Sequence, residues 1–182
     1  MKLEKDRCVG VLIDVQERLH PHMHDATSVE ANCRTLLEGL AVLGVPVVAT
    51  EQYPKGLGTT VRRIDAALEA AGSTRVEKIE FSCFANAGFR RSLRRTGRQQ
   101  VILMGIEAHV CVLQTAIDLV SSQHDVLVAV DCTSSRSQRD AEIAFRRMES
   151  EGVRLGTYES ILLELCHAAG TPPFKEISRL IK

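Results

Sequence analysis

Short apolar runs that alternate with stretches long enough for a helix constrain the fold of this chain more than any other feature. The clearest run, residues 8–13, contains no charged or strongly polar side chain. Continuous apolar runs are typical of parallel strands that are buried on both faces. We expect the six strands at 8–13, 46–49, 75–79, 100–104, 126–130 and 153–155. Because parallel strands need long crossover connections, the pattern predicts a three-layer α/β domain, with a six-stranded parallel sheet covered by helices on both faces.

Helical spacing of apolar residues fills the stretches between these strands. It predicts helices at 29–43, 60–71, 87–95, 109–121 and 138–151, with Thr60 as a cap, and a helical tail from 160 to 182 that breaks at Pro172 and Pro173. Residues 54–58 contain proline and two glycines, which predicts a loop. The 182 residues contain no repeat or linker, so we expect a single domain over 1–182.

The charge balance limits the expected partners. The chain has 23 Lys and Arg residues against 23 Asp and Glu residues, for a formal net charge of zero. Nucleic-acid binding as a main task is therefore not expected, because phosphate neutralisation needs a surplus of cations. No apolar run approaches the ~20 residues of a membrane span, and residues 1–7 lack the apolar core of a secretion signal. We expect a cytoplasmic protein with no membrane partner.

The six cysteines are far apart in the sequence and contain no C-x-x-C pair. A chain of this length needs no disulfide framework, so reduced thiols are expected. The cysteines are Cys8, Cys33, Cys83, Cys111, Cys132 and Cys166.

Polar side chains that directly follow predicted strands mark the place to look for chemistry, because ligands of an open parallel sheet bind beyond the carboxyl ends of its strands. Asp14 follows the first strand, Lys78 ends the third, Cys111 lies in the first turn after the fourth, and Asp131 follows the fifth. A base, a cation and a thiol at three strand ends have the composition of an acyl-transfer site.

Each of these three residues also has an ordinary structural interpretation. Free N–H groups and the helix dipole at the predicted helix start favour a thiolate at Cys111, but a free cysteine is more often a buried structural residue. Asp14 suits a general base, or a carboxylate that accepts bonds from its own turn. Lys78 suits a cation that lowers a neighbouring pKa, or a solvated surface lysine.

Three segments at these positions resemble the signatures of the isochorismatase-like cysteine hydrolases, and the resemblance extends over essentially the whole chain. The segments are Leu12-Ile13-Asp14-Val15-Gln16, the stretch from Glu77 to Phe84, and the stretch from Gly105 to Val112. The resemblance implies a catalytic triad of Asp14, Lys78 and Cys111 and a sheet of strand order 3-2-1-4-5-6. It also implies a cis peptide at Glu107–Ala108 and an oxyanion hole formed by the N–H groups of Ala108 and Cys111.

The activity that this resemblance implies is hydrolysis of a small amide-like carbon–nitrogen bond through a cysteine thioester. Nicotinamide-hydrolysing members carry an Asp-x-His metal site after the second strand, where this chain reads Thr50-Glu51-Gln52-Tyr53. A nicotinamidase is therefore not expected, and neither a metal nor another cofactor is expected. Isochorismate hydrolysis itself needs no thiol nucleophile. This chain resembles instead the branch of isochorismatase-domain-containing proteins, whose substrate the sequence does not reveal.

Candidate substrate-binding residues lie in or beside the resembling segments: Gln16, Gln52, Phe81 and Phe84. The resemblance also favours a homo-oligomer, either a dimer or a tetramer. Two rival interpretations stay open: a binding protein that keeps the fold without turnover, and a redox-responsive protein in which Cys111 is oxidised.

Two further groups of residues are weaker candidates. His20, His22 and His24 would share one face of an extended loop and bind a metal there, although a solvated loop is the favoured interpretation. Residues 131–136 are interpreted as a capping and turn element, with Arg136 as a minor candidate for binding a substrate carboxylate or for a subunit contact. His109 is expected to line the pocket or the surface, because neighbouring residues of a helix point in different directions.

Overall fold

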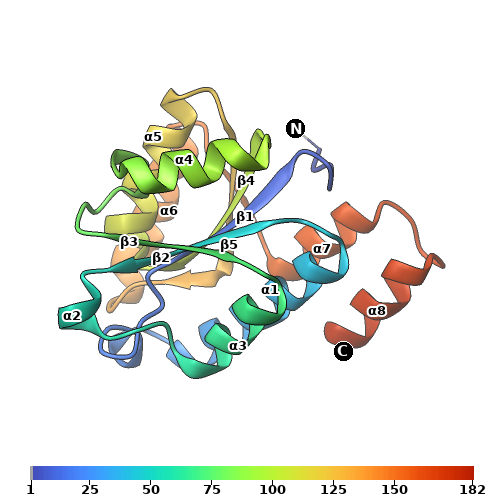
Figure 1. The fold of residues 1–182 in the computed structure, drawn as a ribbon, viewed down its shortest axis with the longest axis horizontal. Coiled ribbons are helices and arrows are strands. Elements are labelled where there is room, and N and C mark those ends of the chain that lie inside the picture. The colour runs from blue at the N-terminus through green and yellow to red at the C-terminus, as the bar shows by residue number, and fades with distance from the viewer. Residues whose placement is uncertain (1) are drawn as a thin grey trace.

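The structure, a computed structural model, describes residues 2–182 and has a six-stranded parallel sheet at its centre (Figure 1). The strand order is β3-β2-β1-β4-β5-β6 and every neighbouring pair is parallel. This confirms both the predicted fold class and the order that the family resemblance implied. The strands are β1 (Cys8–Ile13), β2 (Val47–Gln52), β3 (Thr74–Lys78), β4 (Gln100–Ile106), β5 (Asp125–Ser134) and β6 (Arg154–Gly156).

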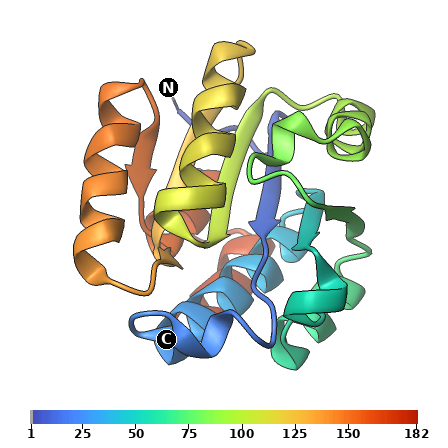
Figure 2. The ribbon, with the colours of Figure 1, turned by 90° about the vertical axis from the view of Figure 1, so that its left-hand side faces the viewer.

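Helices cover both faces of the sheet, as Figures 1 and 2 show. One face carries α1 (Ala26–Val42), α3 (Arg62–Ala70), α7 (Tyr158–Cys166) and α8 (Pro172–Leu180). The other carries α4 (Ala87–Thr96), α5 (Leu113–Ser121) and α6 (Gln138–Ser150). Four short turns of helix complete the chain: η1 (His20–His22), α2 (Pro54–Leu57), η2 (Cys83–Ala85) and η3 (Ala108–Val112). Among residues 2–182, no helix has both the length and the apolar character that crossing a membrane requires.

Alternating side chains of β1 explain why this strand is apolar throughout. Cys8 and Leu12 pack in the core beneath α1, whereas Val9, Val11 and Ile13 pack in the core beneath α4 and α5. Burying each large aliphatic side chain contributes about 1.5–3 kcal/mol. A polar residue at any of these positions would lose its hydration and would not supply this stabilisation. The first polar residue therefore follows the end of the strand, at Asp14.

Several predicted element limits are corrected by the structure. The loop predicted at 54–58 is the short helix α2, because Pro54 at the first helical position needs no N–H partner there. Thr60 does not cap α3: its N–H and its hydroxyl both donate to Glu51 Oε1. The prolines at 172 and 173 begin α8 instead of interrupting a helix.

The turn predicted at 131–136 is also wrong for most of its length. β5 continues through Ser134, since Thr133 pairs with Gly105 and Ser134 with Ile106 after a register shift between β4 and β5. The irregular register explains why the apolar run ends at Val130 while the strand does not. The carboxyl end of β5 therefore lies beside the end of β4, where Cys111 follows.

Candidate active site

Asp14 stands immediately after β1 in a left-handed backbone conformation, with φ of 54°. Aspartate tolerates this region better than most residues, and strained backbone often accompanies functional sites. The side chain is completely buried, with 0% exposure. Its Oδ1 accepts a hydrogen bond of 2.7 Å from the Thr50 hydroxyl at the end region of β2. The turn at the end of β1 thus directs a carboxylate into the protein, where it needs a cation.

Lys78, the last residue of β3, supplies that cation. Its Nζ lies 2.6 Å from Asp14 Oδ2 and 2.6 Å from Gln52 Oε1. The backbone oxygens of Glu80 and Phe81 lie 3.2 and 3.4 Å from the same nitrogen. A side chain that is buried with its charge paired and its donors directed at acceptors is held in one position.

Cys111 completes the group from the other side of the switch in strand order. It lies in η3, a single π-helical turn between β4 and α5, and is 6% exposed. Its Sγ is 3.7 Å from Lys78 Nζ, the same nitrogen that pairs with Asp14 Oδ2. The structure therefore brings together the three residues that the sequence identified at three strand ends.

Burial controls the protonation of this group. It raises the pKa of the Asp14 carboxyl above its ordinary value, although the Lys78 charge and the hydrogen bonds from Lys78 and Thr50 act in the opposite direction. Burial also opposes the charge of Lys78, but the negative charge of Asp14 outweighs it together with the nearby thiols, so the pKa of the ammonium is raised. Lys78 therefore remains a cation throughout the neutral pH range.

The Cys111 thiol behaves differently from the sequence-based expectation. Burial, and then the negative charge of Asp14, raise the pKa of Cys111 well above its ordinary value, and Lys78 offsets only part of this. The thiolate that the helix dipole was expected to stabilise is therefore not the resting form. The resting group is a neutral thiol beside a carboxylate that can accept its proton during attack.

The turn before Cys111 is tied to the loop after β5. The Arg136 guanidinium donates from Nε to Glu107 Oε2 at 2.8 Å, and His109 Nδ1 lies 2.8 Å from the Ser135 hydroxyl. Arg136 is thus paired with a protein carboxylate, and His109 is held at the surface of the turn. Among the described residues the Ala108 N–H has no hydrogen-bond acceptor. The cis peptide lies between Ile106 and Glu107, one bond earlier than expected.

Comparison with known proteins identifies the family. The family model of the isochorismatase domain matches residues 8–160. This chain belongs to the isochorismatase family. It is 40% identical to isochorismatase domain-containing protein 2 of Danio rerio over 181 residues, which are 99% of this chain and 89% of that protein.

Solved structures agree with the fold of this isochorismatase-family protein. The MAR1 ribonuclease of Caenorhabditis elegans matches with a TM-score of 0.93 and 36% identity, over 100% of this chain and 92% of that chain. The YcaC gene product of Escherichia coli, an octameric hydrolase of unknown specificity, matches with a TM-score of 0.87 over 92% of this chain and 83% of that chain. At 22% identity, the second likeness shows the fold alone.

Two residues predicted to bind substrate, Gln16 and Gln52, make hydrogen bonds within and beside the site. Gln16 is fully buried, with its amide donating to the Gln52 and Gly58 carbonyls and accepting from the Gln52 N–H. The Gln52 side chain accepts from Lys78 and donates to the Ile79 carbonyl. Gln52 thus holds Lys78, and Gln16 holds the backbone of Gln52. Their role in substrate binding stays a prediction.

The two predicted aromatic residues differ in position. Phe84 packs against the core under α4 and α5 and makes an edge contact with His124 at 6.0 Å between ring centroids. Phe84 is partly buried there, and its role in substrate binding stays a prediction. The Phe81 ring is 55% exposed, close to the end of β3, and stays available to a ligand.

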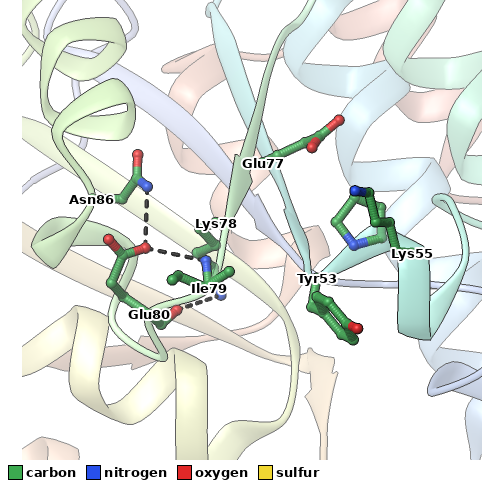
Figure 3. A pocket seen from close by; sticks show the side chains of 8 residues that line it. Tyr53, Lys55, Glu77, Lys78, Ile79, Glu80 and Asn86 are labelled. Carbon is green, nitrogen blue, oxygen red and sulfur yellow. Dashed lines mark hydrogen bonds between the residues drawn. The ribbon is translucent and has the colours of Figure 1, made fainter.

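A cavity of about 400 Å³ opens beside the end of β3 (Figure 3). Tyr53 and Lys55 lie on one side of it, Glu80 and Asn86 on the other, and Lys78 at its base between them. Asp14 and Cys111 do not line this cavity. The Lys78 side chain is itself 0% exposed, so the cavity does not open onto its ammonium group, and the thiol is reached through its own small exposed surface.

The three histidines after β1 do not share a face. His20 and His22 belong to the 3-10 turn η1, and His20 Nε2 lies 2.9 Å from the Ala26 carbonyl oxygen. The extended loop assumed for metal binding is therefore wrong. In residues 2–182, no group of three or more His, Cys, Asp or Glu side chains has the arrangement to hold a metal ion.

Sequence reasoning missed two members of the site. Thr50 donates to Asp14, and Cys83 Sγ lies 3.6 Å from the Thr50 hydroxyl. Thr50 pairs with Ile13 in the parallel register, so it follows the apolar run of β2 as Asp14 follows that of β1. Thr50 directly follows the strand predicted at 46–49, so the rule that selects polar residues at strand ends also selects it, whereas Cys83 has no such signal.

Proposed function

We propose that this protein is a cysteine hydrolase that cleaves a small amide-like carbon–nitrogen bond through a Cys111 thioester. The observation that carries the proposal is the buried contact among a cation, a carboxylate and a thiol: Lys78 Nζ is 2.6 Å from Asp14 Oδ2 and 3.7 Å from Cys111 Sγ. Burying such charged groups is costly without a function or compensating bonds.

In the first half of the reaction, Cys111 Sγ bonds to the substrate carbonyl carbon while the thiol proton moves to Asp14. The carbonyl oxygen becomes an oxyanion that accepts hydrogen bonds from the Ala108 and Cys111 N–H groups, and one such donor is worth ~10²–10³ in rate. Asp14 then returns the proton to the substrate nitrogen as the carbon–nitrogen bond breaks. An amine or ammonia leaves and a thioester remains.

In the second half, a water molecule attacks the thioester carbon and gives a proton to Asp14. The carbon–sulfur bond breaks, the sulfur takes the proton back from Asp14, and a carboxylic acid is released. Lys78 keeps its charge throughout. It lowers the cost of placing negative charge on Asp14 and on the sulfur, because an opposite charge at this distance stabilises an anion.

The position of Cys111 restricts the substrate class. A thiol that is 6% exposed is reached by a narrow acyl group and not by a bulky peptide or a folded polymer. Phe81 offers an exposed ring near the Lys78 strand end for an apolar part of the substrate. The homo-oligomer implied by the resemblance stays a prediction, which light scattering of the purified protein would test.

The proposal predicts turnover of at least one compound in a panel of small primary amides, carbamoyl compounds and cyclic imides, measured as release of ammonia or acid. Cys111→Ala is expected to reduce the rate to background, a loss of at least about 10⁴-fold, as expected when a nucleophile is removed. An acid quench during turnover is expected to leave the acyl mass on the Cys111 peptide.

Turnover that survives Cys111→Ala would contradict the proposed nucleophile. Cys8→Ala is a matched control, because it also removes a buried thiol, one that lies in the core beneath α1. This variant is expected to have a kcat/KM within about twofold of the wild-type value. A wild-type protein that turns over none of the panel but forms a sulfenic acid at Cys111 with dilute peroxide would favour the redox-responsive alternative.

A further inference from the structure

Helix α4 carries the strongest local concentration of positive charge in this chain. Five arginines occur within nine residues, at 90, 91, 94, 95 and 98, and residues 81–106 contain no aspartate or glutamate. Over the whole sequence the charges cancel. The net charge of zero therefore conceals a segment with a charge of plus five, and the potential near a surface depends on local charges rather than on the total.

Four of these arginines form one continuous surface, which we call the α4 arginine face: Arg90, Arg91, Arg94 and Arg95. Steps of four residues place side chains on the same side of a helix, one turn or ~5.4 Å further along. The opposite side of α4 is anchored by Phe89 and Leu93, both buried in the core. Figure 2 shows α4 nearly end-on at the rim of the molecule.

The charges of the α4 arginine face are not neutralised within the protein. Arg91, Arg94 and Arg95 are exposed, and none of the ion pairs among the described residues includes an arginine of α4. Arg90 is half-buried and donates from Nη1 to the Phe84 and Ala85 carbonyls, which fixes its guanidinium. The four arginines and Ala87 surround a shallow hollow of about 510 Å³.

Arginines on α6 make an informative contrast. That helix has Arg139, Arg146 and Arg147, but it also carries four acidic residues, at 140, 142, 149 and, just beyond its end, 151. Arg147 pairs with Glu151 at 3.9 Å. The α6 surface thus has the mixed charge that solubility requires, whereas the α4 arginine face has cations only.

We propose that the α4 arginine face is a docking surface for the phosphate backbone of single-stranded nucleic acid. Guanidinium groups bind phosphate oxygens through two parallel hydrogen bonds, and a row of them along a helix matches a linear polyanion. A membrane surface fits less well, because the two large apolar residues of α4, Phe89 and Leu93, face the core and neither is left to insert among lipids. The surface is narrow, a few phosphates long, which suits one strand better than a duplex.

The net charge of zero led to the expectation that nucleic-acid binding is not a main task of this protein, and the proposed docking surface limits that expectation to the rest of the surface. A net charge of zero disfavours nucleic acid as a partner of the whole surface, but it does not bear on one unneutralised helix. The docking surface is also independent of the proposed hydrolase chemistry, since none of its arginines belongs to the group around Cys111. Failure of one proposal therefore leaves the other intact.

Contacts with phosphates predict weak binding with a defined salt dependence. Three phosphates neutralised on a single strand give a slope of about −2 for the logarithm of the affinity against the logarithm of salt concentration. Non-specific affinities of this kind are on the order of 10⁻⁴–10⁻⁶ M, so the measurement belongs at low salt.

The test uses the full-length protein and a fluorescein-labelled oligouridylate of about 12 nucleotides, with binding followed by fluorescence anisotropy at several salt concentrations. The test variant combines Arg91→Gln, Arg94→Gln and Arg95→Gln. The control combines Arg139→Gln, Arg146→Gln and Arg147→Gln, which removes the same charge from α6. Glutamine has nearly the helix propensity of arginine, so both variants are expected to unfold within a few degrees of the wild type.

The proposal predicts a loss of at least about tenfold in affinity for the α4 variant, with a slope near zero, and a change of about twofold or less for the α6 variant. Three results would overturn it: no binding by the wild-type protein at low salt, equal losses in the two variants, or binding to anionic lipid vesicles without binding to the oligonucleotide. The last result would assign the surface to a membrane instead.

Discussion

Replacing Lys78 by methionine is expected to lower the free energy of unfolding by about 3–5 kcal/mol near pH 8, because it leaves a buried carboxylate without its cation. Asp14 is 0% exposed, and Lys78 is its only ion-pair partner among the described residues. Methionine preserves much of the side-chain volume, so the loss reports the charge and the hydrogen bonds and not a cavity.

This loss is expected to depend on pH in a definite direction. The pKa of Asp14 is already raised by burial, and Lys78 is the largest influence that lowers it, so the Lys78→Met variant raises it further. A carboxyl group whose pKa is raised in the folded state does not change the free energy of unfolding at pH values below its unfolded-state pKa. It lowers the free energy of unfolding as the pH rises through its folded-state pKa. The difference from the wild type is therefore small near pH 4 and largest at neutral and alkaline pH.

A double variant separates the charge effect from general damage. Adding Asp14→Asn to Lys78→Met removes the unpaired charge, and asparagine accepts the left-handed backbone at this position. We expect the double variant to recover about 2 kcal/mol or more of the loss near pH 8, measured by urea unfolding. A Lys78→Met variant with wild-type stability at every pH would contradict the buried ion pair.

Gly105→Ala adds one methyl group and is expected to lower the free energy of unfolding by at least about 4 kcal/mol. A loss of this size is expected to prevent folded protein from accumulating. Gly105 has φ of 120°, which residues with a side chain rarely adopt. An added Cβ would lie 2.7 Å from the Ile13 backbone nitrogen and closer still to the Ile13 carbonyl oxygen. Both are backbone atoms of β1, which cannot move without displacing Asp14.

Gly97→Ala is the matched control for this substitution. Gly97 follows α4 with φ of 66°, and an added Cβ would meet no atom within 4 Å. It therefore measures the cost of the backbone conformation alone, which is about 1–2 kcal/mol. Equal losses of unfolding free energy in the two variants, read from urea or thermal unfolding, would show that close packing against β1 is not the cause.

The fold was predictable because β1 and β4, and most of β2 and β5, are buried on both faces and so have apolar sequences. The first polar residue after such a run marks the strand end, which led directly to Asp14. The edge strand β3 is charged at three of its five positions, so no apolar run marked Lys78 in this way. The family resemblance added the strand order, which neither periodicity nor composition determines. Limits of elements were less predictable where pairing continues past the apolar run, as it does from Asp131 to Ser134 in β5.

Protonation and side-chain partners were not predictable from the sequence. The helix start favours a Cys111 thiolate locally, but burial and the Asp14 charge raise the pKa of the thiol more strongly in the folded protein. Gln16 and Gln52 were expected to meet substrate because they flank the signature segments. In the structure their side-chain amides form hydrogen bonds with backbone groups and with Lys78. These bonds depend on the register of β1, β2 and β3, which the sequence does not reveal.

The most direct test of the central claim, that Asp14 takes the Cys111 proton during attack, is the rate of Cys111 alkylation by iodoacetamide as a function of pH, resolved by peptide mass spectrometry. Cys166 is the internal reference, because it is partly exposed and burial is the only cause that raises the pKa of its thiol. Its rate is expected to rise about tenfold per pH unit below that pKa, as for any thiol that must ionise first.

With Asp14 as the base, the Cys111 rate is expected to be nearly constant from pH 7 to 8.5 and to exceed that of Cys166 at pH 7. Asp14→Asn is expected to restore the tenfold rise per pH unit at Cys111 while leaving Cys166 unchanged. A wild-type Cys111 that follows the same steep profile as Cys166, or that resists iodoacetamide while the smaller reagent methyl methanethiosulfonate also fails to modify it, would contradict the proposed role of Asp14 and Cys111.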